Sequence, residues 1–139
     1  MKEMIYTAFG VVGSFIASLF GGWTAGMTTL LIFMAVDYAT GLLTAVFRKS
    51  AKSESGGLES RAGFKGLCRK GVMLLVVLVA YRLDLLIGAN YIRDMVVIAF
   101  CTNEVISIVE NCGLMGLPLP QIITKIIDVL KNKAEEHEE

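Results

Sequence analysis

The sequence has few of the residue types that build catalytic, metal or disulfide-rich sites. Its 139 residues include one histidine, two prolines and three cysteines. Cys68, Cys101 and Cys112 are odd in number and widely spaced, so they form neither a disulfide framework nor a CxxC metal knuckle. We interpret them as small apolar side chains. These absences argue against an enzyme, and we expect no cofactor and no metal ion.

Charge is missing from a long stretch near the start of the chain. No charged residue occurs from Met4 to Val36, and a membrane-spanning helix needs about 20 apolar residues. The chain is 55% hydrophobic with a mean hydropathy of +0.64, which is more than a soluble domain of this size carries. We therefore predict one all-α integral membrane domain over residues 1–139. Apolar sequence continues without a cleavage site, so we expect the N-terminal segment to stay attached.

Positive charge is concentrated in residues 48–70. This segment holds seven lysines and arginines against two acids, between apolar stretches. Because Lys and Arg are retained on the inner side of a membrane, we expect a basic cytoplasmic loop that contacts anionic lipid, with both termini also cytoplasmic. The net charge is zero because acids gather in residues 135–139, so this segregation reports topology and predicts no nucleic-acid partner. The basic residues are Arg48, Lys49, Lys52, Arg61, Lys65, Arg69 and Lys70.

The hydrophobic pattern predicts two helical hairpins around this loop. The third span requires partners for Arg82 and Asp84 within the membrane, and the fourth is amphipathic and lies either in the interface or across the bilayer. The predicted number of transmembrane helices is therefore three to four. We expect helices at about residues 4–20, 26–47, 71–91 and 94–112, the first two in a tight hairpin, followed by an amphipathic helix at 121–133 and an acidic tail at 134–139.

Small residues follow one face of the first predicted helix. In lipid, small side chains let helices approach closely, which is a main source of helix association. The pattern therefore indicates tight packing within the hairpin, contacts between copies of the chain, or ordinary tolerance of glycine in a membrane helix. The face consists of Gly10, Gly13, Ser14, Ala17 and Gly21, and Gly41 with Ala45 forms a second small face in the next helix.

Polar side chains fall inside the predicted spans. An ionised aspartate at the centre of a span costs about 2.5 to 3.5 kcal/mol, so Asp37 must face protein or water, be protonated, or lie near a headgroup; Arg82 is one candidate partner. The fourth helix gathers its polar residues within an arc of about 120°. With no nucleophile or ligand set beside them, its carboxylates do not indicate acid–base catalysis. We predict pore-lining or intersubunit positions at Asp37, Asn103, Glu104, Ser107, Glu110 and Asn111.

Three blocks of residues resemble the holins found in phages and prophages of Gram-positive bacteria. They are Asp37-Tyr38-x-Thr40-Gly41, then Ser60-x-x-Gly63-x-x-Gly66-x-x-Arg69-Lys70, then Asn103-Glu104-x-x-Ser107-x-x-Glu110-Asn111-x-Gly113-x-x-Gly116-x-Pro118-x-Pro120. The resemblance implies a protein of the host cytoplasmic membrane that forms homo-oligomers and opens a large lesion. A cell-wall hydrolase (endolysin), or in some relatives a toxin, leaves the cell through it. An antiholin is a further partner that the resemblance implies, whereas an active site is not.

Two other classes of function remain open from the residues alone. One is a small ion channel or transporter subunit, with Asp37, Arg82, Asp84 and Glu104 as a conduction or proton path. The other is an antiholin or membrane scaffold that binds a helix bundle without opening anything. The size of the released solute separates a channel, which passes ions, from a holin, which passes folded protein.

Overall fold

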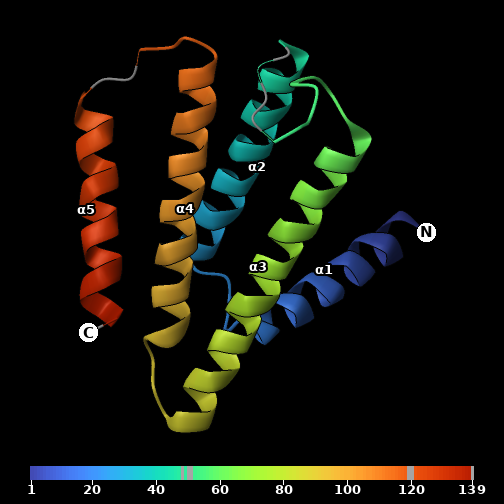
Figure 1. Cartoon of the computed structure of the whole chain (residues 1–139). Coiled ribbons are helices and arrows are strands. Elements are labelled where there is room, and N and C mark those ends of the chain that lie inside the picture. The colour runs from blue at the N-terminus through green and yellow to red at the C-terminus, as the bar shows by residue number, and fades with distance from the viewer. Residues whose placement is uncertain (48, 50–51, 119–120, 139) are drawn as a thin grey trace.

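The computed structural model describes residues 1–47, 49, 52–118 and 121–138, and these form five helices and no strand. The predicted all-α class is confirmed. In Figure 1, α2, α3 and α4 form a bundle, α5 runs antiparallel beside α4, and α1 projects away on the other side. The helices are α1 (Lys2–Leu19), α2 (Ala25–Val46), α3 (Ser60–Ile87), α4 (Ile92–Leu114) and α5 (Gln121–Glu138).

The apolar core lies between α2, α3 and α4. Its buried residues repeat at helical spacing on each of the three helices, as an inward-facing stripe does. Leu30 and Val77 are fully buried at its centre, and free Cys101 fills part of it as a small apolar residue. The core consists of Met27, Leu30, Met34, Met73, Val77, Val97 and Cys101.

A short turn joins α3 to α4. Gly88 ends α3 in the left-handed conformation at φ 70°, where glycine carries no steric cost. Asp84 is 5% exposed and accepts hydrogen bonds from the backbone amides of Ile92 and Arg93, each at 2.9 Å. Asp84 thus accepts from two of the amides that the first turn of α4 leaves unpaired. These two amides are the hydrogen-bond partners that a buried carboxylate requires.

The tight hairpin predicted for the first two helices is absent. No residue of α1 is buried, and a Cβ atom added to Gly10 or Gly13 would meet nothing within 4 Å. The α1 helix diverges from α2 instead (Figure 1). Of the interpretations of its small-residue face, packing within the hairpin is therefore wrong, and contacts between copies stay a prediction.

The end of α1 is set by Gly21 and Gly22, whose φ angles are 84° and 90°. Arg93 Nη1 donates to the carbonyl oxygens of Phe20 at 2.9 Å and Gly21 at 3.1 Å, and its guanidinium lies 5.6 Å from the centre of the Tyr81 ring. Gly21 therefore forms the turn rather than a helix-packing face. These bonds direct α1 away from the bundle.

Two predicted boundaries are wrong. The basic segment 48–70 is not all loop, because α3 begins at Ser60. The last helix does not end at residue 133, because α5 continues to Glu138 through alanine and glutamates, which are strong helix formers. Arg48 lies outside the described residues.

Among the described residues, one helix, α2, is long and apolar enough to cross a membrane by length and composition. The prediction of three to four spans is thus supported for one helix only. Apolar side chains are nevertheless exposed along other helices, including Val72, Leu75 and Val79 of α3. An exposed apolar surface of this extent is rare on soluble monomers and typical of a membrane or interaction surface.

We expect Gly21→Ala to destabilise the protein more than Gly22→Ala. Both replacements put alanine in a left-handed conformation, at a cost of about 1–2 kcal/mol. Only at position 21 would the new Cβ overlap the Tyr81 ring and approach Arg93 Nη1 to 2.7 Å, which adds about 1–3 kcal/mol. The free energy of unfolding in detergent micelles measures both, and equal losses would show that the overlap is relieved at no cost.

Candidate functional site

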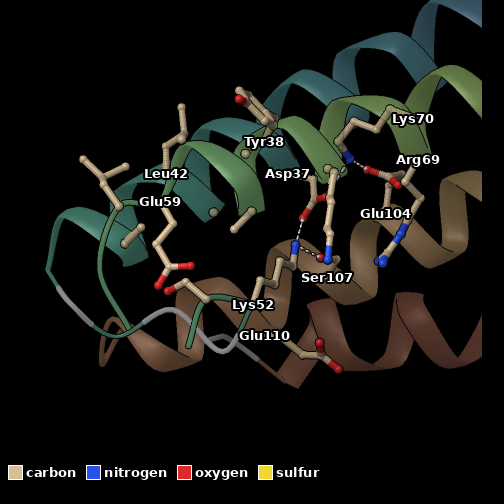
Figure 2. A pocket seen from close by; sticks show the side chains of 18 of the residues that line it. Asp37, Tyr38, Leu42, Lys52, Glu59, Arg69, Lys70, Glu104, Ser107 and Glu110 are labelled. Carbon is tan, nitrogen blue, oxygen red and sulfur yellow. Dashed lines mark hydrogen bonds and ion pairs between the residues drawn. The ribbon is translucent and has the colours of Figure 1, made fainter. Parts of the chain in front are cut away.

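A polar cavity of about 380 Å³ lies between α2, α3, α4 and the α2–α3 connection. Figure 2 shows charged side chains from all three helices pointing into it. Residues of the three sequence blocks that are far apart along the chain meet here. Those that line it include Asp37, Tyr38 and Gly41 of α2, Gly63, Gly66, Arg69 and Lys70 of α3, and Asn103, Glu104, Ser107 and Glu110 of α4.

Lys70 connects two buried carboxylates at the inner end of the cavity. Its Nζ atom lies 2.7 Å from Asp37 Oδ2 and 2.5 Å from Glu104 Oε2. The side chains are 14% exposed for Lys70, 6% for Asp37 and 4% for Glu104. Charged groups leave water at a high cost in free energy unless they are paired and hydrogen-bonded, so this cation lowers the cost of burying the two carboxylates inside the bundle. We call Asp37, Lys70 and Glu104 the ion cluster.

Asn111 of α4 holds Asp37 from the other side. Its Nδ2 donates to Asp37 Oδ1 at 3.2 Å, to the Asp37 carbonyl oxygen at 3.3 Å and to Thr40 Oγ1 at 3.0 Å. A Cβ atom at Gly41 would lie 3.7 Å from the same Nδ2. The small face at Gly41 thus brings α2 close to α4 of its own chain, together with buried Ala45.

The α2–α3 connection also reaches into the cavity. Lys52 Nζ donates to Ser107 Oγ at 3.2 Å and lies 3.7 Å from Asp37 Oδ1. Its side chain remains 52% exposed, so this ion pair is screened by water and contributes little. Farther along the connection, the hydroxyl and amide of Ser55 donate to Glu59 Oε1 at 2.8 and 3.1 Å, and these bonds hold the pKa of Glu59 below its ordinary value.

Glycines let α3 approach α2 beside this cluster. A Cβ atom at Gly63 would lie 3.3 Å from the Tyr38 hydroxyl, and one at Gly66 would lie 3.9 Å from the Tyr38 ring. On a helix, positions 63, 66 and 70 share one face. The face that contacts Tyr38 therefore also directs Lys70 towards Asp37.

The polar positions predicted from the sequence divide into two groups. Glu104 and Asn111 are buried at 3% and 4% exposure and contact other helices of the same chain, whereas Asn103 and Glu110 are exposed. The polar face of α4 is therefore exposed to water at some positions and buried at others. Asp37 faces protein, which was one of the alternatives predicted for it. The predicted partner Arg82 was wrong, because Arg82 is exposed and Lys70 pairs with Asp37 instead.

Sequence reasoning missed Lys70 as a member of this cluster, because its segment was interpreted as a surface loop. The signal was the spacing from Gly63 and Gly66 to Lys70, which repeats at helical period. Among the other residues assigned to the loop surface, Lys49, Arg61, Lys65 and Arg69 are exposed. In the part of the chain that the structure describes, no three His, Cys, Asp or Glu side chains converge on a metal site.

Known proteins match this chain in sequence along nearly its whole length. The family model described as "Bacteriophage holin family" matches residues 14–132. An uncharacterised protein of Clostridium perfringens strain 13 is 37% identical over 94% of this chain and 94% of its own. A protein of Bacillus phage phi105 named "Probable holin" is 29% identical over 79% of this chain and 77% of its own. No solved structure matches.

We expect Lys70→Met to lower the free energy of unfolding by roughly 3 kcal/mol, because it leaves Asp37 and Glu104 buried with less compensating charge. Adding Asp37→Asn and Glu104→Gln to Lys70→Met should recover most of the loss, because no uncompensated charge remains. Arg61→Met removes an exposed cation from the same helix and should change stability by less than about 0.5 kcal/mol. Equal effects of Lys70→Met and Arg61→Met in micelles would contradict a structural role of the ion cluster.

Proposed function

The chain belongs to the bacteriophage holin family, whose members are non-enzymatic membrane proteins, and on this premise we propose that it opens lesions in the host cytoplasmic membrane. Copies of the chain oligomerise there, and the lesion releases a folded endolysin or a secreted toxin. The family match and the phage relative named "Probable holin" support the proposal. An antiholin that delays assembly is a further partner in this scheme.

The observation that carries the proposal is an apolar helix that packs on almost nothing in its own chain. The α1 helix has no buried residue, and large side chains such as Tyr6, Phe9 and Phe15 are 64% to 74% exposed. In a bilayer, lipid tails cover these side chains. Its small-residue face then remains available for close approach to another copy, which is how helices associate in lipid.

The ion cluster lets a closed protomer keep its charged groups inside the bundle at a small cost in free energy. Lys70 pairs with both Asp37 and Glu104 inside the bundle, so lipid need not solvate these groups. We propose that assembly separates α2 from α4, after which these groups line an aqueous lumen together with exposed Asn103 and Glu110. The same polar residues thus serve the closed protomer and the open lesion.

We propose that the basic end of the bundle faces the cytoplasm and that both termini are cytoplasmic, which requires α5 to leave its antiparallel position beside α4 and lie on the inner membrane surface. Lys49, Lys52, Arg61, Lys65 and Arg69 lie at the end where α2 connects to α3, which is the arrangement retained on the inner side of a membrane. In this topology α1, α2, α3 and α4 all cross the bilayer. Arg93 and Trp23 then lie near its outer surface, where Trp is enriched.

The geometry gives less support to an ion channel within one protomer. The candidate path needs polar groups from Asp37 to Asp84, yet Asp84 is engaged at the start of α4. The apolar core, with Leu30 and Val77 fully buried, fills the space between the helices. Conduction would thus require a lumen formed by several copies, as in the lesion proposed.

The proposal is tested with vesicles of anionic lipid that contain both a small dye and a folded fluorescent protein. As the density of the chain in the membrane is raised, we expect both solutes to be released above a threshold, because assembly depends on concentration. Release of dye alone would favour the channel, and release of neither would favour the antiholin or scaffold.

We expect Gly13→Leu to raise the threshold density for release, because a large side chain on the small-residue face keeps the α1 helices of two copies apart. Val12→Leu is the matched control, since Val12 is exposed on the opposite face of α1. Crosslinking of the membrane-bound chain measures oligomers directly. Equal thresholds for the two variants would exclude this face as the contact.

A further inference from the structure

The cavity holds cationic and hydroxyl groups that the ion cluster does not use. Lys65 and Arg69 of α3 line it, one helical turn apart, so they share a face. Within the described part of the chain, neither side chain takes part in a hydrogen bond or ion pair. Two neighbouring donors therefore face the cavity without an anionic partner.

Ser53 supplies an independent observation in the same cavity. Its Oγ atom is buried and, unusually, has no hydrogen-bond partner among the described residues, although Ser53 lines the cavity. Buried polar atoms are nearly always hydrogen-bonded, and an orphaned one calls for an explanation. Rotation of the Ser53 side chain about its Cα–Cβ bond would bring this buried hydroxyl to the cavity, where a ligand that accepts a hydrogen bond would supply the missing partner.

The carboxylates that line the cavity do not neutralise Lys65 and Arg69. Asp37 and Glu104 are paired with Lys70, and Glu59 accepts two hydrogen bonds from Ser55. Glu110 is exposed and remains as the one further carboxylate of the lining. The wall also carries apolar side chains, namely Leu42, Ala45, Leu58 and Ile106.

We propose that this cavity binds a phosphate-bearing anion, with Arg69, Lys65 and Ser53 as its donors. A guanidinium donates two parallel hydrogen bonds to phosphate oxygens, and basic pockets at the cytoplasmic ends of membrane helices bind phospholipid headgroups. The apolar wall favours a phospholipid, whose glycerol and acyl portions would lie along Leu42 and Leu58. A free phosphate would use the same donors without the wall.

The proposal is tested on the purified full chain in neutral detergent by native mass spectrometry, with phosphatidylglycerol and phosphatidylcholine offered at equal concentration. We expect one phosphatidylglycerol to be retained selectively. Lys65→Gln with Arg69→Gln should lower its retention by about tenfold or more. Ser53→Ala should lower it by about tenfold, the effect of losing one hydrogen bond to a charged group.

Lys49→Gln with Arg61→Gln is the matched control, because it removes two exposed cations that do not line the cavity. Equilibrium dialysis with radioactive inorganic phosphate tests the second source. Binding of phosphate that is lost in Lys65→Gln with Arg69→Gln, without selective lipid retention, would assign the site to a soluble anion. Equal loss in the two double variants, or binding of neither probe, would overturn the proposal. The assay measures no release, so its outcome is independent of lesion formation.

Discussion

The arrangement of α2, α3 and α4 depends on one cation shared by two carboxylates. Lys70 reaches Asp37 on one helix and Glu104 on another, and without it both acids would be buried with less compensating charge. A charged contact of this kind tolerates no slip of a helix by a turn, whereas an apolar core of methionine and leucine does. We propose that the ion cluster specifies the register of the three helices, while the apolar core supplies the burial.

The two ends of the bundle differ in what holds them. At the end beside the α2–α3 connection the contacts are ionic and open to a cavity. At the other end, Asp84 engages the start of α4 and Arg93 binds the carbonyls at the end of α1. The bundle is thus fixed at both ends, while α1 is held at its C-terminal end only, by Arg93 and by the packing of Phe20 against the core. The α1 helix is therefore the part of the chain that is most available for a first contact with another copy.

Much of the fold could be predicted from the sequence, because apolar runs and their interruptions locate helices. The five helices follow from pattern, and the cost of an ion in an apolar setting predicts that Asp37 must face protein or water, be protonated, or lie near a headgroup. The identity of that partner could not be obtained this way. It depends on the register between α2 and α3, and Lys70 lies in a segment whose charges and glycines are equally typical of a loop. The direction of α1 depends on Arg93, a contact 72 residues away from Gly21.

Under the proposed function, the polar groups that close the protomer are the ones that open the lesion. Each of Asp37, Glu104 and Asn111 has its partners within one chain, so an isolated copy gains little by exposing them. In lipid, separating α2 from α4 without water would break the hydrogen bonds between Asn111 and Asp37 and draw one carboxylate away from Lys70, at a cost of several kcal/mol. When α2 and α4 separate in several copies at the same time, a shared column of water replaces these partners. The internal ion cluster therefore makes opening unfavourable for one copy and accessible to an assembly, which couples lesion formation to density in the membrane.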